Sequence, residues 1–329
     1  MDIKKKIISK IREYDRIFVF RHERADGDCV GAAIAVRTVL RDTYPTKQVY
    51  YADPEDLGMY SFLGERDPDP SDSCYEGSLA IVVDTANEER ISNKRYSLCR
   101  ESIKIDHHPE REGSGYGTLS WVDPDRSSVS EMIAELFLEN TEFTVGKDAA
   151  EALFVGIVTD SGRFRFDSVS PRTMEITAGL LKKGVDTEKV YSLIYLTDLN
   201  VLKFNSYVYD QMKVTENGVA YVRVTKEAME RFGLSYDEAA EAVKLLSCVK
   251  GALCWIMFID DVKAEGSTDI RVRLRSRFMS VNGIAEMHDG GGHAHASGAT
   301  AHSQQEADQI LAEADEAVRK YKTTHEGWL

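Results

Sequence analysis

Ile105-Asp106-His107-His108-Pro109 is the stretch of the sequence that decides the predicted fold. It follows directly on the short β-like run 102–105, so an acid and two histidines stand at the end of a strand. Burying a carboxylate and two imidazoles is costly unless a partner compensates them, and a divalent metal ion is the commonest such partner. The stretch therefore indicates a metal site at a strand end.

Other acids and histidines follow apolar runs in the same half of the chain. The run 16–21 leads to His22, and the continuous apolar run 79–83 leads to Asp84. Helical patterns lie between such runs, including the small-residue segment 29–40. Strands that alternate with helices predict a parallel α/β sheet, and such sheets bind ligands beyond the carboxyl ends of their strands. A site is therefore expected where these strands end.

After about residue 210 the pattern changes to that of a second, smaller domain. Runs 218–224, 254–259 and 270–276 predict strands, and the last alternates arginine with apolar residues. Residues 190–202 predict one continuous helix before the change, and residues 304–321 a closing helix. The predicted fold class is α/β, with a parallel-sheet domain at residues 1–195, a helical connector at 196–214, a smaller C-terminal α/β domain at 215–329 and an active-site cleft between the two domains.

The composition is that of a globular protein. The 329 residues are 43% hydrophobic and 29% charged, and no apolar run approaches the ~20 residues that span a bilayer. The five cysteines include no Cys-x-x-Cys pair, which argues against a disulfide framework and a zinc–thiolate site. Cys29 is interpreted as a small packing residue. We therefore expect a cytoplasmic protein that does not act at a membrane.

The net charge restricts the partners. The 41 Lys and Arg residues against 55 Asp and Glu residues give a net charge of −14. The field of such a protein repels phosphate, so a phosphate-bearing substrate must be small or must meet a local cluster of positive charge. Metal ions and the stretch 271–277, which holds four arginines, are the two candidates for that charge.

Six residues form the candidate metal site. The loop His22-x-x-x-Asp26-x-Asp28 brings one imidazole and two carboxylates together, and Gly27 is expected to let the backbone turn between the carboxylates. Nitrogen and oxygen ligands without thiolate suit a pair of Mn²⁺-like ions, and two divalent ions balance the charges of four aspartates. The predicted metal ligands are His22, Asp26, Asp28, Asp84, His107 and Asp160.

Paired metal ions are a common device for hydrolysing phosphoesters. His108 follows a ligand, so it is expected to touch the phosphate or to donate a proton. The ordered motifs resemble those of the DHH phosphoesterase superfamily, which includes RecJ-type exonucleases, family II pyrophosphatases and nanoRNase/pAp phosphatases. The resemblance implies that one ion is held by His22, Asp26 and Asp84, that the other is held by Asp28, Asp84, His107 and Asp160 with Asp84 bridging, that His108 contacts the scissile phosphate, and that Asp106 orients the histidines.

A second motif lies in the C-terminal half. Residues 289–298 hold four glycines and two histidines, and glycines let backbone amides approach an anion closely. The motif resembles the Gly-Gly-Gly-His motif of the DHH-associated C-terminal domain, which recognises the nucleotide end of the substrate. Arg275 matches a Leu-Arg-Ser segment of that domain, and Arg163 follows a family pattern in which it orients substrate or pairs with a carboxylate. The implied substrate-binding residues are Arg163, Arg275, Gly291, Gly292, His293, Ser297 and Gly298, with Arg271, Arg273 and Arg277 as weaker candidates, and the catalytic residues are Asp84, Asp106 and His108.

The sequence departs from the commoner family pattern in two places. Glu23-Arg24-Ala25 precedes Asp26, where Asn-Pro is frequent, and Asp289 stands where a further glycine is usual. Neither change removes a predicted ligand, but Asp289 is expected to alter phosphate affinity.

The resemblance implies a Mn²⁺-dependent enzyme that degrades very short RNA (nanoRNA) to mononucleotides and converts 3′-phosphoadenosine 5′-phosphate (pAp) to AMP. The acidic charge agrees, because longer strands need an extended basic track. Hydrolysis of cyclic di-AMP or of its linear product pApA is the alternative, and no residue separates the two. A non-catalytic nucleotide sensor is the alternative of another class, although no predicted ligand is missing. Whether two copies form a homodimer is left open.

Overall fold

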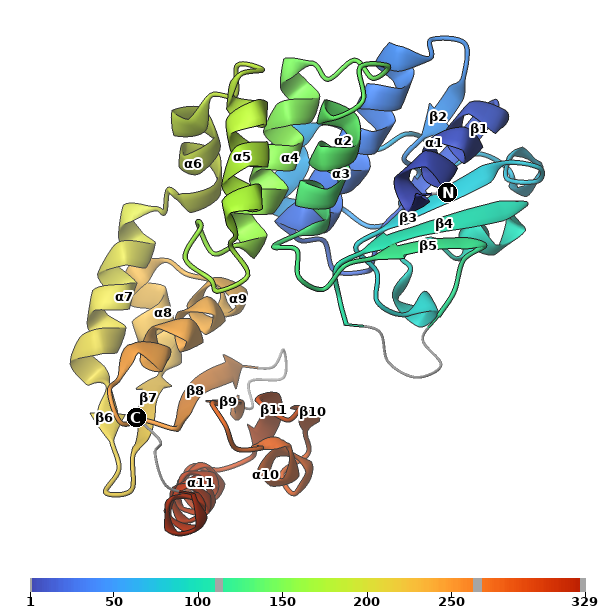
Figure 1. Ribbon diagram of the computed structural model, residues 1–329. Coiled ribbons are helices and arrows are strands. Elements are labelled where there is room, and N and C mark those ends of the chain that lie inside the picture. Colours follow the sequence, from blue (N-terminus) through green and yellow to red (C-terminus); the bar gives the residue numbers. More distant parts are fainter. Residues whose placement is uncertain (1, 110–114, 263–267, 326–329) are drawn as a thin grey trace. The chain divides into compact units, whose positions relative to one another are not determined.

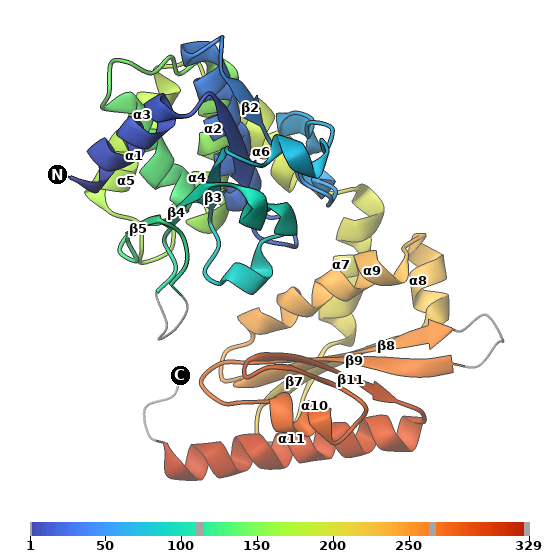
Figure 2. The same ribbon diagram turned by 90° about the vertical axis from the view of Figure 1, so that its right-hand side faces the viewer.

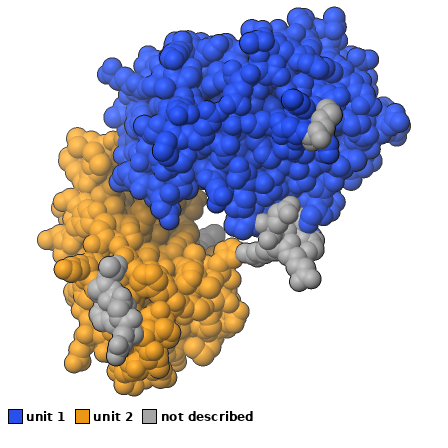
Figure 3. All heavy atoms as spheres, viewed as in Figure 1, with its two compact units in different colours: residues 1–196 blue, residues 197–329 orange. Residues whose placement is uncertain are grey.

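The structure is a computed structural model that describes residues 2–109, 115–262 and 268–325. The chain divides into two compact units, Met1–Leu196 and Thr197–Leu329 (Figure 3). Each unit has its own sheet and its own hydrophobic clusters. Over the ranges that the structure describes, no helix is both long and apolar enough to cross a membrane.

The first unit, in its described part, is built on a five-stranded parallel sheet with the strand order β2-β1-β3-β4-β5 (Figure 1). β3 lies at the centre and is buried along its whole length, as expected for an apolar strand that is covered on both faces. The strands are β1 (Arg16–Phe20), β2 (Gln48–Tyr50), β3 (Leu79–Val83), β4 (Glu101–Asp106) and β5 (Leu119–Val122).

Helices cover one face of this sheet, and short irregular segments cover the other. Ile17 and Ile81 belong to a large cluster with the helices, whereas their neighbours Phe18 and Val82 pack with the aromatic ring of Tyr75 and the segments after it. Side chains alternate between the faces of a strand, so one face carries helices and the other carries short irregular segments. The helices are α1 (Ile3–Glu13), α2 (Gly27–Thr43), α3 (Val129–Leu138), α4 (Lys147–Asp160), α5 (Pro171–Leu181) and α6 (Thr187–Tyr195).

The second unit has, among its described residues, a six-stranded mixed sheet with the order β10-β11-β9-β8-β7-β6. Only the β7–β8 pair of these strands is parallel. Figure 2 shows the long helix α11 along one face of the sheet and α7, α8 and α9 on the other. The elements are α7 (Leu199–Gln211), β6 (Lys213–Val214), β7 (Val219–Val224), α8 (Lys226–Phe232), α9 (Tyr236–Ala240), β8 (Cys254–Val262), β9 (Thr268–Ser276), α10 (Asn282–Glu286), β10 (Gly291–His293), β11 (Ala296–Ala301) and α11 (Gln304–Thr324).

The predicted fold class is confirmed as two α/β units with a parallel sheet in the first. The single helix predicted over residues 190–202 is wrong, because α6 ends at Tyr195 and α7 begins at Leu199. The apolar spacing that continues through the break does not mark the buried face of one helix, because Leu196, Leu199 and Leu202 are all exposed. The predicted domain bounds and the connector at 196–214 stay a prediction.

Candidate metal and substrate sites

The loop between β1 and α2 holds the first group of candidate ligands. Asp26 caps α2, because its side chain accepts a hydrogen bond of 2.9 Å from the backbone N–H of Cys29. The Nδ1 atom of His22 lies 2.6 Å from the carbonyl oxygen of Glu23, which assigns the proton to Nδ1 and leaves Nε2 as the free ligand atom. That Nε2 atom lies 3.2 Å from Asp26 Oδ2 and 3.4 Å from Asp84 Oδ2.

Asp28 lies in the first turn of α2 and is completely enclosed by the protein. Its two carboxylate oxygens accept hydrogen bonds of 2.7 Å from the N–H of Val129 and 2.8 Å from the N–H of Ser130. These N–H groups open α3, so the positive end of that helix favours the carboxylate. Asp28 is thereby fixed in position before any ligand binds.

Glycines allow the helices around this site to approach one another. A Cβ atom at Gly27 would lie 2.3 Å from Thr159 Oγ1, and one at Gly156 would lie 2.0 Å from Ser130 Oγ. Gly27 is the first residue of α2 and has no positive φ, so the predicted turn between the two carboxylates is wrong. Gly27 is required because α2 and α4 pack closely, which brings Asp28 toward Asp160.

Asp84 stands at the centre of the site. It follows β3 in a left-handed conformation (φ 52°), which an aspartate tolerates better than most residues, and it is buried. Its Oδ2 atom faces His22, whereas its Oδ1 atom lies 3.5 Å from His107 Nε2 and 3.6 Å from His108 Nδ1. This buried Oδ1 atom has no hydrogen-bond partner within the described ranges. A buried carboxylate oxygen without a partner fits a bound cation.

The end of β4 supplies the two histidines. The Nδ1 atom of His107 lies 3.2 Å from the carbonyl oxygen of Arg126, which leaves Nε2 toward Asp84 and toward Asp160 Oδ2 at 3.3 Å. His108 instead places its Nδ1 atom 2.8 Å from Asp106 Oδ1. Both imidazoles are thus held through Nδ1, while the nitrogen that lies near Asp84 Oδ1 is Nε2 in His107 and Nδ1 in His108.

The structure brings all six predicted ligands together. Together with Cys29 and His108, which were not predicted as ligands, their ligand atoms form three overlapping groups, each with atoms within 4.8 Å of one another and each able to hold a metal ion. Cys29 is an unpredicted member of the first group, and its only sequence signal is its position three residues after Asp26. The groups are His22 with Asp26, Cys29 and Asp84; Asp84 with His107 and His108; and Asp28 with His107 and Asp160.

The electrostatics show an excess of negative charge. Burial, together with the charges of Asp84 and Asp160, raises the pKa of Asp28 well above its ordinary value. Burial also raises the pKa of Asp160 to about 6. Burial opposes ionisation of His107, yet the neighbouring carboxylates raise its pKa. The crowded carboxyl groups thus keep their protons more readily than isolated ones. Bound divalent ions could replace these protons and offset the negative charge of the carboxylates.

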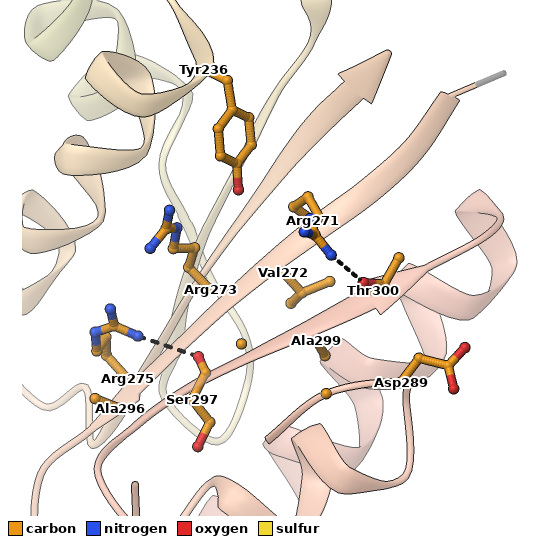
Figure 4. Close-up of a pocket in the computed structure, with 12 residues that line it drawn as sticks. Tyr236, Arg271, Val272, Arg273, Arg275, Asp289, Ala296, Ser297, Ala299 and Thr300 are labelled. Atoms are coloured by element: carbon orange, nitrogen blue, oxygen red, sulfur yellow. Dashed lines mark hydrogen bonds between the residues drawn. The ribbon is translucent and has the colours of Figure 1, made fainter. Parts of the chain in front are cut away.

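The predicted substrate-binding residues are divided between the two units. Arg275, Ser297 and Gly298 line a pocket of about 420 Å³ beside β9 and β11 (Figure 4). The Ser297 hydroxyl group is already bonded to the carbonyl oxygen of His293 at 2.8 Å. Arg163 belongs to the first unit, where its guanidinium carbon lies 3.9 Å from the centre of the Tyr195 ring. Gly291, Gly292 and His293 form β10, which pairs with β11 but does not line the pocket.

Comparison with known proteins identifies the family. Residues 16–157 match the DHH family, N-terminal domain, and residues 216–320 match the DHHA1 domain. The chain therefore belongs to the DHH family. It is 38% identical, over 97% of its length and 100% of the relative, to the bifunctional oligoribonuclease and PAP phosphatase NrnA of Bacillus subtilis. The corresponding protein of Streptococcus mutans, named as a probable enzyme of the same kind, is 34% identical over 94% of this chain and 97% of its own.

A solved structure shares the fold of the whole chain. The crystal structure of an exopolyphosphatase-related protein from Bacteroides fragilis matches with a TM-score of 0.78 and covers 98% of this chain and 97% of its own. The two sequences are 24% identical, so this likeness concerns the fold alone.

Proposed function

We propose that this protein is a phosphoester hydrolase that degrades short oligoribonucleotides to mononucleotides and converts pAp to AMP. The observation that carries the proposal is the position of Asp84, whose two carboxylate oxygens face His22 on one side and His107 on the other. A carboxylate shared by two ligand groups suits paired metal ions, and paired ions suit phosphoester hydrolysis. The names of the two relatives, which match this chain over 97% and 94% of its length, support this substrate class.

The proposed cofactors are two divalent ions, most simply Mn²⁺, because the donors are imidazole nitrogens and carboxylate oxygens. When bound, such ions lower the pKa of a water molecule and stabilise the charge that develops on the phosphate oxygens. His22, Asp26 and Asp84 would hold one ion. Asp28, His107 and Asp160, which form one ligand group, would hold the other together with the shared Asp84, whose Oδ1 atom lies 3.5 Å from His107 Nε2.

His108 is the proposed contact of the scissile phosphate. Its Nδ1 atom is engaged by Asp106, so Nε2 can approach the substrate, and the half-exposed imidazole can donate a proton to the leaving oxygen. Burial opposes ionisation of Asp106, but the hydrogen bond with His108 lowers its pKa. Lys104 adds a positive charge, with its Nζ atom 3.3 Å from Asp106 Oδ2. The lowered pKa keeps Asp106 ionised, and this carboxylate orients the His108 imidazole.

In the second unit, Arg275 and the glycine-rich hairpin are the proposed contacts of the substrate's nucleotide. The guanidinium of Arg275 donates to the carbonyl oxygens of Leu274 and Ser297, which hold it at the pocket wall. The other proposed contacts are Gly291, Gly292, His293, Ser297, Gly298 and Arg163. We also propose that the protein acts in the cytoplasm, which agrees with five cysteines that form no disulfide.

A turnover assay with Mn²⁺ tests the proposal. The full chain is offered a 5′-phosphorylated RNA trimer, pAp and cyclic di-AMP side by side, and the products are separated chromatographically. We expect mononucleotides from the trimer and AMP from pAp, with little action on cyclic di-AMP. Preference for cyclic di-AMP would show that the protein is instead a cyclic-dinucleotide phosphodiesterase. No hydrolysis of any of the three compounds would reject the enzyme and favour a non-catalytic nucleotide sensor.

A further inference from the structure

The pocket of the second unit has a wall of arginines. Arg271, Arg273 and Arg275 alternate along β9 with Val272 and Leu274, which are buried in a hydrophobic cluster. The three guanidinium groups therefore project from one face of the strand, where Figure 4 shows them around the pocket.

The three arginines differ in the partners of their charged guanidinium groups. Arg271 is engaged: its Nη1 donates a 2.8 Å hydrogen bond to Thr300 Oγ1, and its Nε lies 3.4 Å from Asp261 Oδ2. Among the described residues, the hydrogen-bond partners of the Arg275 side chain are the carbonyl oxygens of Leu274 and Ser297, which carry no full charge. Arg273 has no carboxylate within ion-pair distance in the ranges that the structure describes, and its guanidinium carbon lies 5.8 Å from the centre of the Tyr236 ring.

Acids near the pocket do not supply the missing charge. Asp289 lies at the pocket wall but its Oδ2 atom is 3.0 Å from His302 Nε2. Glu241 attracts Arg275 electrostatically, but its own Oε2 atom lies 3.4 Å from Lys244 Nζ, with which it forms an ion pair. Burial, followed by repulsion from Arg273, lowers the pKa of Arg275. Within the described ranges, no carboxylate at ion-pair distance supplies a counter-charge to these two neighbouring guanidinium groups, in a protein whose net charge is −14. An anionic ligand would supply it.

An aromatic ring faces these charges. Tyr236 begins α9, is half-buried and lines the same pocket (Figure 4). Gly298 lines the same pocket and pairs directly with Arg273, so the two residues present the same face of the sheet. A Cβ atom on Gly298 would meet nothing closer than Val272 O at 3.7 Å, so the absent side chain leaves room for a ligand.

We propose that Arg273 and Tyr236 form a nucleotide-binding subsite of this pocket, in which Arg273, next to Arg275, takes a phosphate and the Tyr236 ring stacks on the base. The volume of about 420 Å³ lies within the range of small-molecule sites. Every base has an aromatic face, so stacking on tyrosine accepts different nucleotides. This inference rests on the proposed function, because the pocket by itself requires only an anion beside an aromatic group.

Calorimetric titration of the EDTA-treated full chain tests the subsite without turnover. The probes are AMP, ribose 5-phosphate, which lacks the base, and adenosine, which lacks the phosphate. Arg273→Gln should lower the binding affinities for AMP and for ribose 5-phosphate equally, by roughly 10-fold or more. Tyr236→Leu should weaken AMP by about 5- to 150-fold and leave ribose 5-phosphate unchanged, whereas Tyr236→Phe should bind AMP like the wild type. Gly298→Val, which fills the space beside Arg273, should weaken the binding of both AMP and ribose 5-phosphate.

The matched control is Arg319→Gln, which changes an exposed arginine of α11 paired with Glu316, and melting temperatures check that each variant is folded. AMP binding that does not respond to Arg273→Gln and Tyr236→Leu would overturn the subsite, as would no AMP binding by the wild type. If the wild type hydrolyses pAp and both variants keep its KM, the subsite is wrong while the proposed function stands. Binding that follows the expected pattern without any hydrolysis would support the subsite and reject the proposed function.

Discussion

Replacing Asp84 by asparagine should reduce turnover more than any other single ligand change. Asparagine keeps the size of the side chain and tolerates the left-handed backbone at this position, so the substitution chiefly removes a charge. The two Asp84 oxygens lie 3.4 Å from His22 Nε2 and 3.5 Å from His107 Nε2, so Asp84 contributes to two ligand groups. Asp26 contributes only to the first.

The magnitude follows from that sharing. Changes to residues that only support a metal ligand typically cost about 10- to 100-fold in affinity or activity, and weakening a ligand costs at least as much, so loss at two sites predicts at least about 10²- to 10⁴-fold. That loss corresponds to at least about 2.7–5.4 kcal/mol of transition-state stabilisation. Asp26→Asn should lose less, at least about 10- to 100-fold, because it weakens one group.

The assay is the initial rate of AMP release from pAp at saturating Mn²⁺, measured for wild type, Asp84→Asn and Asp26→Asn. Asp125→Asn is the control, because Asp125 is exposed and lies outside the ligand groups. Melting temperatures exclude loss of fold. If Asp84→Asn lost no more activity than Asp26→Asn, the shared role of Asp84 would be refuted.

Three further predictions concern orientation, packing and pH. Asp106→Asn should lower kcat by about 10- to 100-fold with little change in KM, because the anion that orients His108 is lost; an unchanged kcat in steady-state kinetics would contradict this. Gly156→Val should destabilise the first unit by at least about 1–3 kcal/mol in a denaturant titration, because its Cβ would overlap Ser130 Oγ, and an unchanged midpoint would count against the close packing. Burial opposes the charge of His288, but hydrogen bonds with Glu313 and Glu306 raise its pKa, so its contribution to stability is complete below about pH 6.5 and is lost as pH rises through the raised pKa. His288→Gln should therefore lower the melting temperature more at pH 6 than at pH 9, and the reverse order would reject this role.

Much of the candidate site was predictable because the carboxyl ends of parallel strands meet at one edge of a sheet. Asp84 and Asp106 follow or end the adjacent strands β3 and β4, so their proximity follows from the sheet alone. The alternation of arginine and apolar residues in β9 likewise predicted which side chains are buried.

Other features depend on contacts between distant segments and have no local signal. The carboxylate of Asp28 is held by the first turn of α3, about a hundred residues later in the chain. Gly27 is required by Thr159, which the sequence pattern around the loop does not reveal. Tyr236 joins the arginines of β9 only because α9 covers that face of the second sheet. The four-residue strand β5 was missed because it is too short to show a clear periodicity.

In the proposed mechanism, phosphoester hydrolysis requires two metal ions held around Asp84. The most direct measurement is the rate of AMP release from pAp by EDTA-treated protein as Mn²⁺ is added, with the number of bound ions per chain determined on the same samples. We predict no turnover without metal and full turnover only when two ions are bound per chain. Full turnover with one bound ion, or turnover that persists in the metal-free protein, would contradict the claim.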